Sequence, residues 1–255
     1  MAQHTELLEA ADADPGRWLG ATALVDLEDP KLRLRVRALT QLCRNEREKA
    51  LALYGFVKRL PLATRFRMRA RTAREVYDAG RGSASEKATL LVAMLRIAGI
   101  PARLRYVAIS AELLRGAAGH LREPDRPLLE IWLQGRWQRT DTYIFDAERM
   151  AAARQRLKRR GWEWGYGLHV GGAKAWNGFE SAYLGGVPTE CDLMVVREVG
   201  VVSDEQEYRT LRPIRGAQRL LRLLQGTLLA PVSPRAWRGL GETQGPASVQ
   251  FHETY

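Results

Sequence analysis

Cysteine is scarce in this sequence of 255 residues, which has only Cys43 and Cys191. Two cysteines so far apart provide neither a disulfide framework nor the ligand spacing of a zinc site. Cys43 ends the apolar helical pattern of residues 34–42 and is predicted to be a small buried residue. Cys191 is flanked by Glu190 and Asp192, whose negative charges disfavour a thiolate. Neither cysteine is therefore a good candidate nucleophile.

Long apolar runs are also missing. The longest one, over residues 88–98, is interrupted by Arg96 and is too short to cross a bilayer. Residues 1–6 have neither the basic nor the apolar region of a signal peptide. We therefore expect a cytoplasmic protein without membrane contact. An apolar content of 45% with 27% charged residues is typical of a globular protein.

Lysine is rare, although the chain is strongly basic. The net charge is +11, yet only six of the 40 basic residues are lysines. Many arginines gather in two clusters, at residues 65–74 and 154–160, and we expect both clusters to be solvated surface. An anionic small molecule, an acidic peptide, or a carrier or other acidic partner protein is the functional alternative. Nucleic acid is not expected as a partner, since the sequence has no recognised nucleic-acid motif.

Histidine is equally sparse, with His4, His120, His169 and His252 as the four examples. They are isolated from one another and lack the carboxylate spacing of a metal site. The sequence therefore predicts no bound metal, and we expect no cofactor. His120 is expected at the surface of a loop or short helix over residues 110–126.

Helix signals are abundant in the first half of the chain. Caps, prolines and apolar spacing predict helices over about residues 31–43, 46–60, 73–80 and 84–98. The last of these is apolar nearly all round, which predicts a helix buried at the centre of a domain.

Strand signals follow. Strands are expected over residues 103–109, 128–133 and 136–140, the last two joined by a tight turn at Gln134-Gly135. Asp146 is expected to cap a helix that ends near Arg160. The remaining predictions are a structured aromatic loop over 162–186, a strand at 193–196, a basic amphipathic helix over 214–224 and a poorly ordered end.

Two motifs carry the most specific information. The first is Gly82-Ser83-Ala84-Ser85-Glu86-Lys87 at the start of the buried helix, followed by Gly99-Ile100-Pro101-Ala102-Arg103. It resembles the active-site helix of transglutaminase-like thiol enzymes, whose pattern is G-x-C-x-x-K or G-x-C-x-[DE]-K. The second motif is residues 127–137 together with Asp141, which resemble the family block H-x-x-x-E-[VIF]-[YW]-x-[DN]-G-x-W…D.

The resemblance covers roughly residues 20–185 and implies an α+β, papain-like fold. In that fold, N-terminal helices with a buried central helix pack on an antiparallel sheet. We expect one such domain over residues 1–195. Residues 196–255 would add the basic helix and a flexible tail without forming a clear second domain.

The family's chemistry explains the pattern of the two motifs. A cysteine in the first turn of the helix is ionised with help from the helix dipole and free N–H groups. A histidine on a neighbouring strand takes the thiol proton, and an aspartate on the next strand orients that histidine. The resemblance places the nucleophile at Ala84, the histidine at Arg126 and the aspartate at Asp141. Only the aspartate is of the expected type.

Several other residues are candidates for a site. His169 lies in a Tyr-Gly-Leu-His segment that resembles one in some bacterial members, and it is either catalytic or a buried structural residue. Arg126 is predicted to form a charge-assisted pair with Asp141, which either fills the vacant triad space or edges an anion pocket. Candidate substrate-binding residues are Ser83, Ser85, Glu86, Lys87, Tyr143, Tyr166 and Trp176. For Ser83 and Glu86 the structural alternative is a capping box in a solvated first turn.

Three functions remain open. The chain is a transglutaminase-like protein without the thiol, which binds a peptide, acyl or amino-acid-like ligand or has been repurposed to non-thiol chemistry. Alternatively it is a thiol amidase, protease or acyl transferase in a Cys-to-Ala form. The third possibility is a non-enzymatic module that binds partners through its basic surface. The expected ligand is a small molecule, a peptide or a carrier-bound acyl group.

Overall fold

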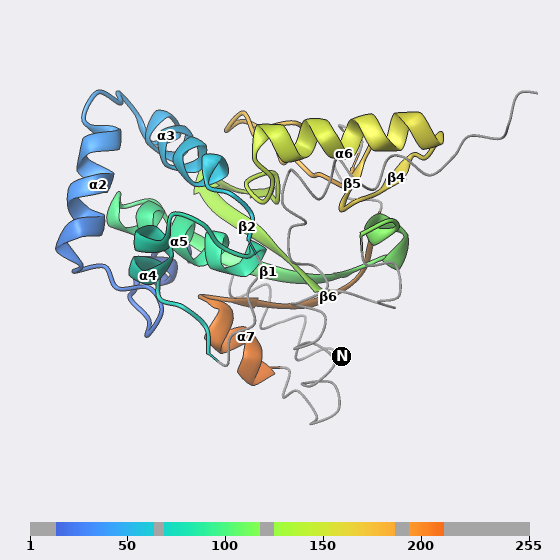
Figure 1. Ribbon diagram of the computed structural model, residues 1–255. Coiled ribbons are helices and arrows are strands. Elements are labelled where there is room, and N and C mark those ends of the chain that lie inside the picture. The colour runs from blue at the N-terminus through green and yellow to red at the C-terminus, as the bar shows by residue number, and fades with distance from the viewer. Residues whose placement is uncertain (1–13, 64–68, 118–124, 187–193, 212–255) are drawn as a thin grey trace, which may run out of the picture.

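Helices come first along the chain, and they pack on an antiparallel sheet formed by the later residues (Figure 1). The computed structural model describes residues 14–63, 69–117, 125–186 and 194–211. The helical part comprises the 3-10 helix η1 (Pro15–Leu19), α2 (Pro30–Thr40), α3 (Glu46–Arg59), α4 (Ala73–Ala79) and α5 (Ala84–Ile97). The four predicted α-helices are therefore confirmed. The first ends three residues early, which leaves Cys43 half-buried rather than buried.

The main sheet has the strand order β3-β2-β1-β6 and is antiparallel throughout. Its strands are β1 (Ala102–Ile109), β2 (Asp125–Leu133), β3 (Arg136–Thr140) and β6 (Val195–Val202). Gln134 and Gly135 both have positive φ, 55° and 76°, as the predicted two-residue hairpin turn requires. This turn fixes the register of β2 against β3 and so determines which residues lie opposite each other.

The helix α5 is the centre of the core. Eleven of its 14 residues are buried, and it packs with Leu104, Leu129 and Ile131 of the sheet. Gly80, at φ 60°, ends α4 in the left-handed conformation just before the turn into α5. The expected architecture, with a buried central helix on an antiparallel sheet, is confirmed.

The remaining elements lie around this core. They are the 3-10 helix η2 (Ala111–Leu114), α6 (Ala147–Arg160), the short strands β4 (Trp164–Gly165) and β5 (Leu168–His169), and α7 (Glu205–Leu211). Asp146 caps α6 by accepting the N–H of Arg149 at 2.8 Å, and Gly161 ends the helix, as predicted. The β4–β5 hairpin lies within the expected aromatic loop.

The later part of the chain departs most from the sequence-based expectation. The strand predicted at 193–196 runs from Val195 to Val202 and pairs with β1, so the sheet continues past residue 195. The helix α7 was not predicted. It begins after Asp204, whose carboxylate accepts the N–H groups of Gln206 and Glu207. The helix predicted at 214–224 lies outside the described residues, as do Cys191, His4, His120 and His252.

Candidate functional site at the start of α5

The first turn of α5 is built by the predicted capping box. The Ser83 hydroxyl accepts the N–H of Glu86 at 3.2 Å, and the Glu86 carboxylate accepts the N–H of Ser83 at 2.8 Å. Ala84 is the first residue of the helix, and Ser83, Ala84 and Ser85 are all half-buried. The local geometry of the motif is therefore complete, and only a methyl group stands at the nucleophile position.

Glu86 is buried, which corrects the expectation of a solvated first turn. Its exposed fraction is 8%, and its carboxylate accepts two hydrogen bonds from the Arg71 guanidinium, one of 2.5 Å from Nε. Arg71 is itself 6% exposed, so this member of the first arginine cluster is not solvated surface. Glu86 needs a cationic partner because a buried carboxylate is costly without one. Its role in the motif is to hold α5 in place.

Lys87 is fully buried, although it had been a candidate for substrate binding. Its Nζ donates to the carbonyl oxygens of Leu60 at 2.8 Å, Ile144 at 2.9 Å and Lys58 at 3.4 Å. The lysine therefore ties α5 to the end of α3 and to the segment that follows β3. Burial lowers the pKa of Lys87 to about 7, although the charge of Asp146 acts against this shift.

Lys58 makes a similar tie from the α3 side. Its Nζ donates to the carbonyl oxygens of Thr142 at 2.7 Å and Phe145 at 2.9 Å. Burial also lowers the pKa of Lys58, to about 8, with the charges of Asp146 and Asp141 opposing the shift. Two lysines thus bind the carbonyl groups of the residues directly after Asp141.

Arg126 and Asp141 form the predicted pair. Arg126 Nη1 donates to Asp141 Oδ2 at 2.7 Å, and Arg126 Nη2 donates to the carbonyl oxygen of Gly167 at 2.8 Å. The other carboxylate oxygen of Asp141 accepts the N–H of Leu184 at 2.7 Å. Asp141 is fully buried and Arg126 is 6% exposed. The pair joins β2, the end of β3 and two segments of the aromatic loop.

The backbone of His169 is linked to this pair through Leu184, but its imidazole contacts Trp164 and Gly171 instead. Its ring centre is 4.2 Å from that of Trp164, and Nδ1 accepts the N–H of Gly171 at 3.0 Å. In the neutral ring the proton is therefore on Nε2. Burial lowers the pKa of His169. Its backbone N–H bonds to Leu184, the residue whose own N–H binds Asp141.

The three aromatic candidates are all buried. The Tyr143 hydroxyl donates to the carbonyl oxygen of Pro127 at 2.9 Å. Tyr166 has a φ of 53° and a ring stacked on Trp162, 6.2 Å centre to centre. Trp176 meets the edge of Tyr54 at 5.6 Å. Each side chain thus has a packing role, and none is brought to the first turn of α5 by a described contact.

The structure does bring one unpredicted residue, Tyr106, to that turn. The Tyr106 hydroxyl on β1 is buried without a well-formed hydrogen bond among the described residues, and it lies beside the Ser85 side chain. Burial raises the pKa of Tyr106 well above its usual value, and the charge of Glu205 on α7 acts in the same direction. Burial also raises the pKa of Glu205. Tyr106 stacks on Tyr208 of α7 at 3.7 Å.

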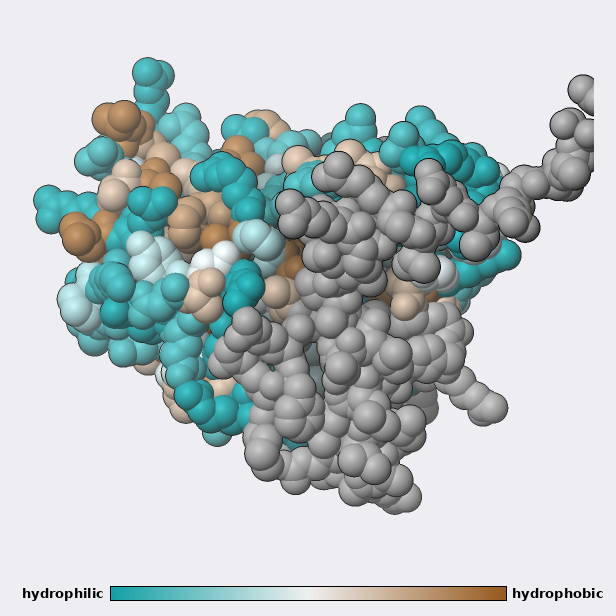
Figure 2. Space-filling model, in the orientation of Figure 1, coloured by the Kyte–Doolittle hydropathy of each residue, from teal (hydrophilic) through white to brown (hydrophobic). Residues whose placement is uncertain are grey.

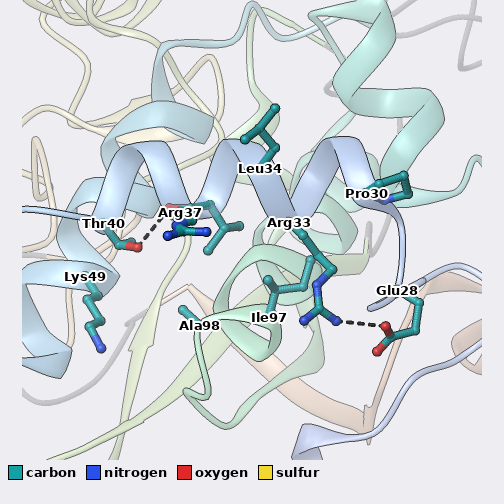
Figure 3. Close-up of a pocket in the computed structure, with 10 residues that line it drawn as sticks. Glu28, Pro30, Arg33, Leu34, Arg37, Thr40, Lys49, Ile97 and Ala98 are labelled. Carbon is teal, nitrogen blue, oxygen red and sulfur yellow. Dashed lines mark hydrogen bonds and ion pairs between the residues drawn. The ribbon is translucent and has the colours of Figure 1, made fainter.

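A groove of about 740 Å³ lies elsewhere on the molecule, between α2, the start of α3 and the end of α5 (Figure 3). Arg33 donates to Glu28 at 2.8 Å at one end of the groove. The lining residues are Glu28, Pro30, Arg33, Leu34, Val36, Arg37, Thr40, Lys49, Ile97 and Ala98. The groove includes none of the predicted site residues.

Two kinds of site are not found in the described part of the chain. No group of three or more histidine, cysteine, aspartate or glutamate residues there could hold a metal ion. No helix within those same ranges is long and apolar enough to cross a membrane.

Comparison with known protein families gives a match over the central region of the chain. Residues 34–142 match the family model of the transglutaminase-like superfamily. No curated protein matches the chain.

Two solved structures are similar to part of the chain. One is a proposed cysteine protease from Cytophaga hutchinsonii, at 19% identity and a TM-score of 0.42, covering 53% of this chain and 42% of that one. The other is a proposed protease from Parabacteroides distasonis, at 23% identity and a TM-score of 0.34, covering 43% and 22%. This chain therefore spans less than half the length of either protein.

Proposed function

Since residues 34–142 match the family model of the transglutaminase-like superfamily, we propose that this chain is a member of that superfamily without the thiol reaction. It binds a peptide, acyl or amino-acid-like ligand at the start of α5. The observation that carries the proposal is the buried ion pair between Arg126 and Asp141. By the sequence resemblance, Arg126 and Asp141 stand at two of the three positions at which the family has its triad.

None of the three triad positions supports acyl transfer. Ala84 has no atom that can attack a carbonyl carbon. An arginine guanidinium has five N–H donors and no acceptor, so Arg126 cannot take a proton from a nucleophile. Both carboxylate oxygens of Asp141 accept hydrogen bonds within the protein, from Arg126 and from the backbone of Leu184. Asp141 is thus part of a structural pair instead of orienting a base.

The retained motif residues have structural reasons to persist without catalysis. A Cβ at Gly82 would lie 3.1 Å from Glu86 and 3.2 Å from Val76, so the approach to α5 is tight. Glu86 pairs with Arg71, and Lys87 binds three carbonyl groups. The G-x-A-x-E-K sequence is therefore explained by how α5 is held. What supports ligand binding is the set of hydroxyl groups on Ser83, Ser85 and Tyr106 at this turn.

The proposal is tested by incubating the protein with amide and thioester substrates. We expect no turnover above the uncatalysed rate, and no mass increase from an acyl group on the protein. Sustained turnover that passes through an acyl-enzyme would overturn the proposal. A ligand found by thermal-shift screening should lose affinity in Ser85→Ala and keep it in Ser181→Ala, a serine whose hydroxyl accepts the N–H of Arg139.

A second candidate is a thiol enzyme represented by an inactive form. The intact capping box favours it, because a cysteine at position 84 would lie in the first helical turn, where N–H groups stabilise a thiolate. In this case Ala84→Cys alone should gain turnover and react with iodoacetamide, whereas Ser85→Cys should not. A silent Ala84→Cys protein supports the first proposal. Activity that appears only in the double variant Ala84→Cys, Arg126→His would show that the thiol reaction needs both a cysteine at position 84 and a histidine at position 126.

A further inference from the structure

The end of α6 carries a group of arginine and aromatic side chains that the proposed function does not use. We call Arg115, Arg156, Arg160, Trp162 and Tyr166 the arginine–aromatic stack. The guanidinium carbons of Arg115 and Arg160 lie 3.8 and 4.7 Å from the Trp162 ring centre. The guanidinium carbons of Arg156 and Arg160 each lie 5.8 Å from the Tyr166 ring centre. Three cations are thus held against two stacked rings.

The stack is fixed by the backbone around it. The N–H of Tyr166 donates to the carbonyl oxygen of Arg115 at 2.8 Å, and the N–H of Trp162 donates to that of Leu157 at 3.0 Å. Gly116 has a φ of 78°, and a Cβ there would meet the Tyr166 ring at 2.7 Å. Only glycine therefore allows the η2 segment to approach the ring. The guanidinium groups of Arg115 and Arg160 are positioned before any ligand binds.

The surface around the stack is strongly positive. Arg115 is exposed, as are Lys158, Arg159 and Arg160 in the last turn of α6. Figure 2 shows hydrophilic residues gathered over this end of α6. Burial lowers the pKa of Arg156, and the charges of Arg159 and Arg160 act in the same direction. These cations repel one another, so a negatively charged ligand would be attracted to them.

We propose that the arginine–aromatic stack, together with Lys158 and Arg159, is a docking site for an acidic peptide segment of a partner protein. The rings of Trp162 and Tyr166 lie against the guanidinium groups. The N–H groups at the edge of each guanidinium can then form paired hydrogen bonds with a carboxylate. Because these side chains are already ordered, binding loses less conformational entropy than it would at free arginines.

The same geometry argues against nucleic acid. Proteins bind single strands by stacking bases on exposed aromatic rings. Tyr166 is 7% exposed, and Trp162 is half-buried and already contacts two guanidinium groups. Within the described residues these two rings therefore offer little surface to a base. The positive charges of the arginine side chains remain accessible, and they can bind a run of carboxylates.

The test is calorimetric titration of the full chain with a synthetic glutamate-rich peptide. The double variant Arg115→Gln, Arg160→Gln should bind at least about tenfold more weakly, because two charge-assisted contacts are lost. Arg160→Lys should also weaken binding by roughly threefold, although it keeps the charge, because lysine lacks the planar fork. The matched control is Arg33→Gln, Arg37→Gln on α2, which changes the net charge equally and should leave affinity within about twofold.

Three outcomes would overturn the proposal: no binding of the peptide, equal weakening by the control pair, or tighter binding of a phosphopeptide or single-stranded oligonucleotide. Circular dichroism establishes whether the variants fold. If the Arg115/Arg160 variant does not, Lys158→Gln, Arg159→Gln serves instead, since both side chains are exposed. Loss of peptide binding in that variant supports the docking site, and unchanged binding contradicts it.

Discussion

The start of α5 and the start of β2 depart from the family pattern in different ways. At α5 an alanine stands at the position where the motif has its cysteine, and Glu86 and Lys87 beside it are buried. At β2 the histidine position carries Arg126, which binds Asp141 and Gly167 and so joins four segments. A reactive atom can be deleted without structural cost, whereas an orphaned buried carboxylate needs a new partner. The two regions therefore differ in kind, because a methyl group at Ala84 needs no partner and the buried carboxylate of Asp141 does.

The largest effect is expected at the Arg126–Asp141 pair. Arg126→Met should reduce the free energy of unfolding by about 4 kcal/mol, because Asp141 is left buried without its cation. Urea denaturation measures this change. Arg126→Met with Asp141→Asn should recover part of the loss, since the buried charge is then removed. If the single variant were as stable as the parent, the pair would not replace the triad structurally.

A slightly smaller effect is expected at Lys87. Lys87→Met should cost roughly 3 kcal/mol, because the carbonyl oxygens of Leu60 and Ile144 lose their donor in the interior. The control is Lys158→Met, whose side chain is exposed on α6 and should change stability by less than about 0.5 kcal/mol. Equal effects at the two lysines would contradict the structural role of the motif.

The protonation of Lys87 also predicts a pH dependence. Its folded-state pKa is about 7, below the unfolded value of about 10.4, so the unfolded chain binds more protons above neutral pH. Stability should therefore rise with pH, by about 1 kcal/mol between pH 7 and 8 from this group. Lys58, with a pKa of about 8, adds in the same direction at higher pH. Lys87→Met should flatten the dependence of the free energy of unfolding on pH near pH 7. If that dependence is unchanged in the variant, it arises from other titratable groups.

The smallest change is expected at the cap of α5. Ser83→Ala removes the hydroxyl that accepts the N–H of Glu86 and should cost about 1 kcal/mol or less. Thermal melting detects this difference. Ser83→Asp restores an acceptor at the same position and should restore stability. A loss well above this size would indicate that Ser83 has contacts beyond the capping box.

Much of the fold followed from short-range patterns. The capping boxes at Thr72 and Ser83, the cap at Asp146 and the turn at Gln134-Gly135 all act within four residues. The Arg126–Asp141 pair was also predictable, because the hairpin turn fixes the register of β2 against β3. The helix α7 was missed, since a seven-residue helix has little apolar periodicity, although Asp204 and Glu207 provide a capping signal.

Burial of charged residues was the main error of the sequence-based view. Glu86 and Arg71 were expected at the surface, and Lys87 was expected to face a ligand. Each is instead buried and contacts groups that are distant in sequence. No local pattern records such contacts.

The order of most elements, the caps of α4 and α5, and the residue types at positions 84 and 126 could be read from the sequence. These properties depend on residue type and on spacing within a turn or a hairpin. The packing of the chain was needed to see that Lys87 holds α3 to the segment after Asp141, that Tyr106 lies beside Ser85, and that Arg115 contacts Trp162 at the end of α6. Burial, hydrogen bonding and charge pairing between distant segments depend on how the chain packs. A buried polar group needs a hydrogen-bond or charge partner, and the tertiary structure determines which residue provides it.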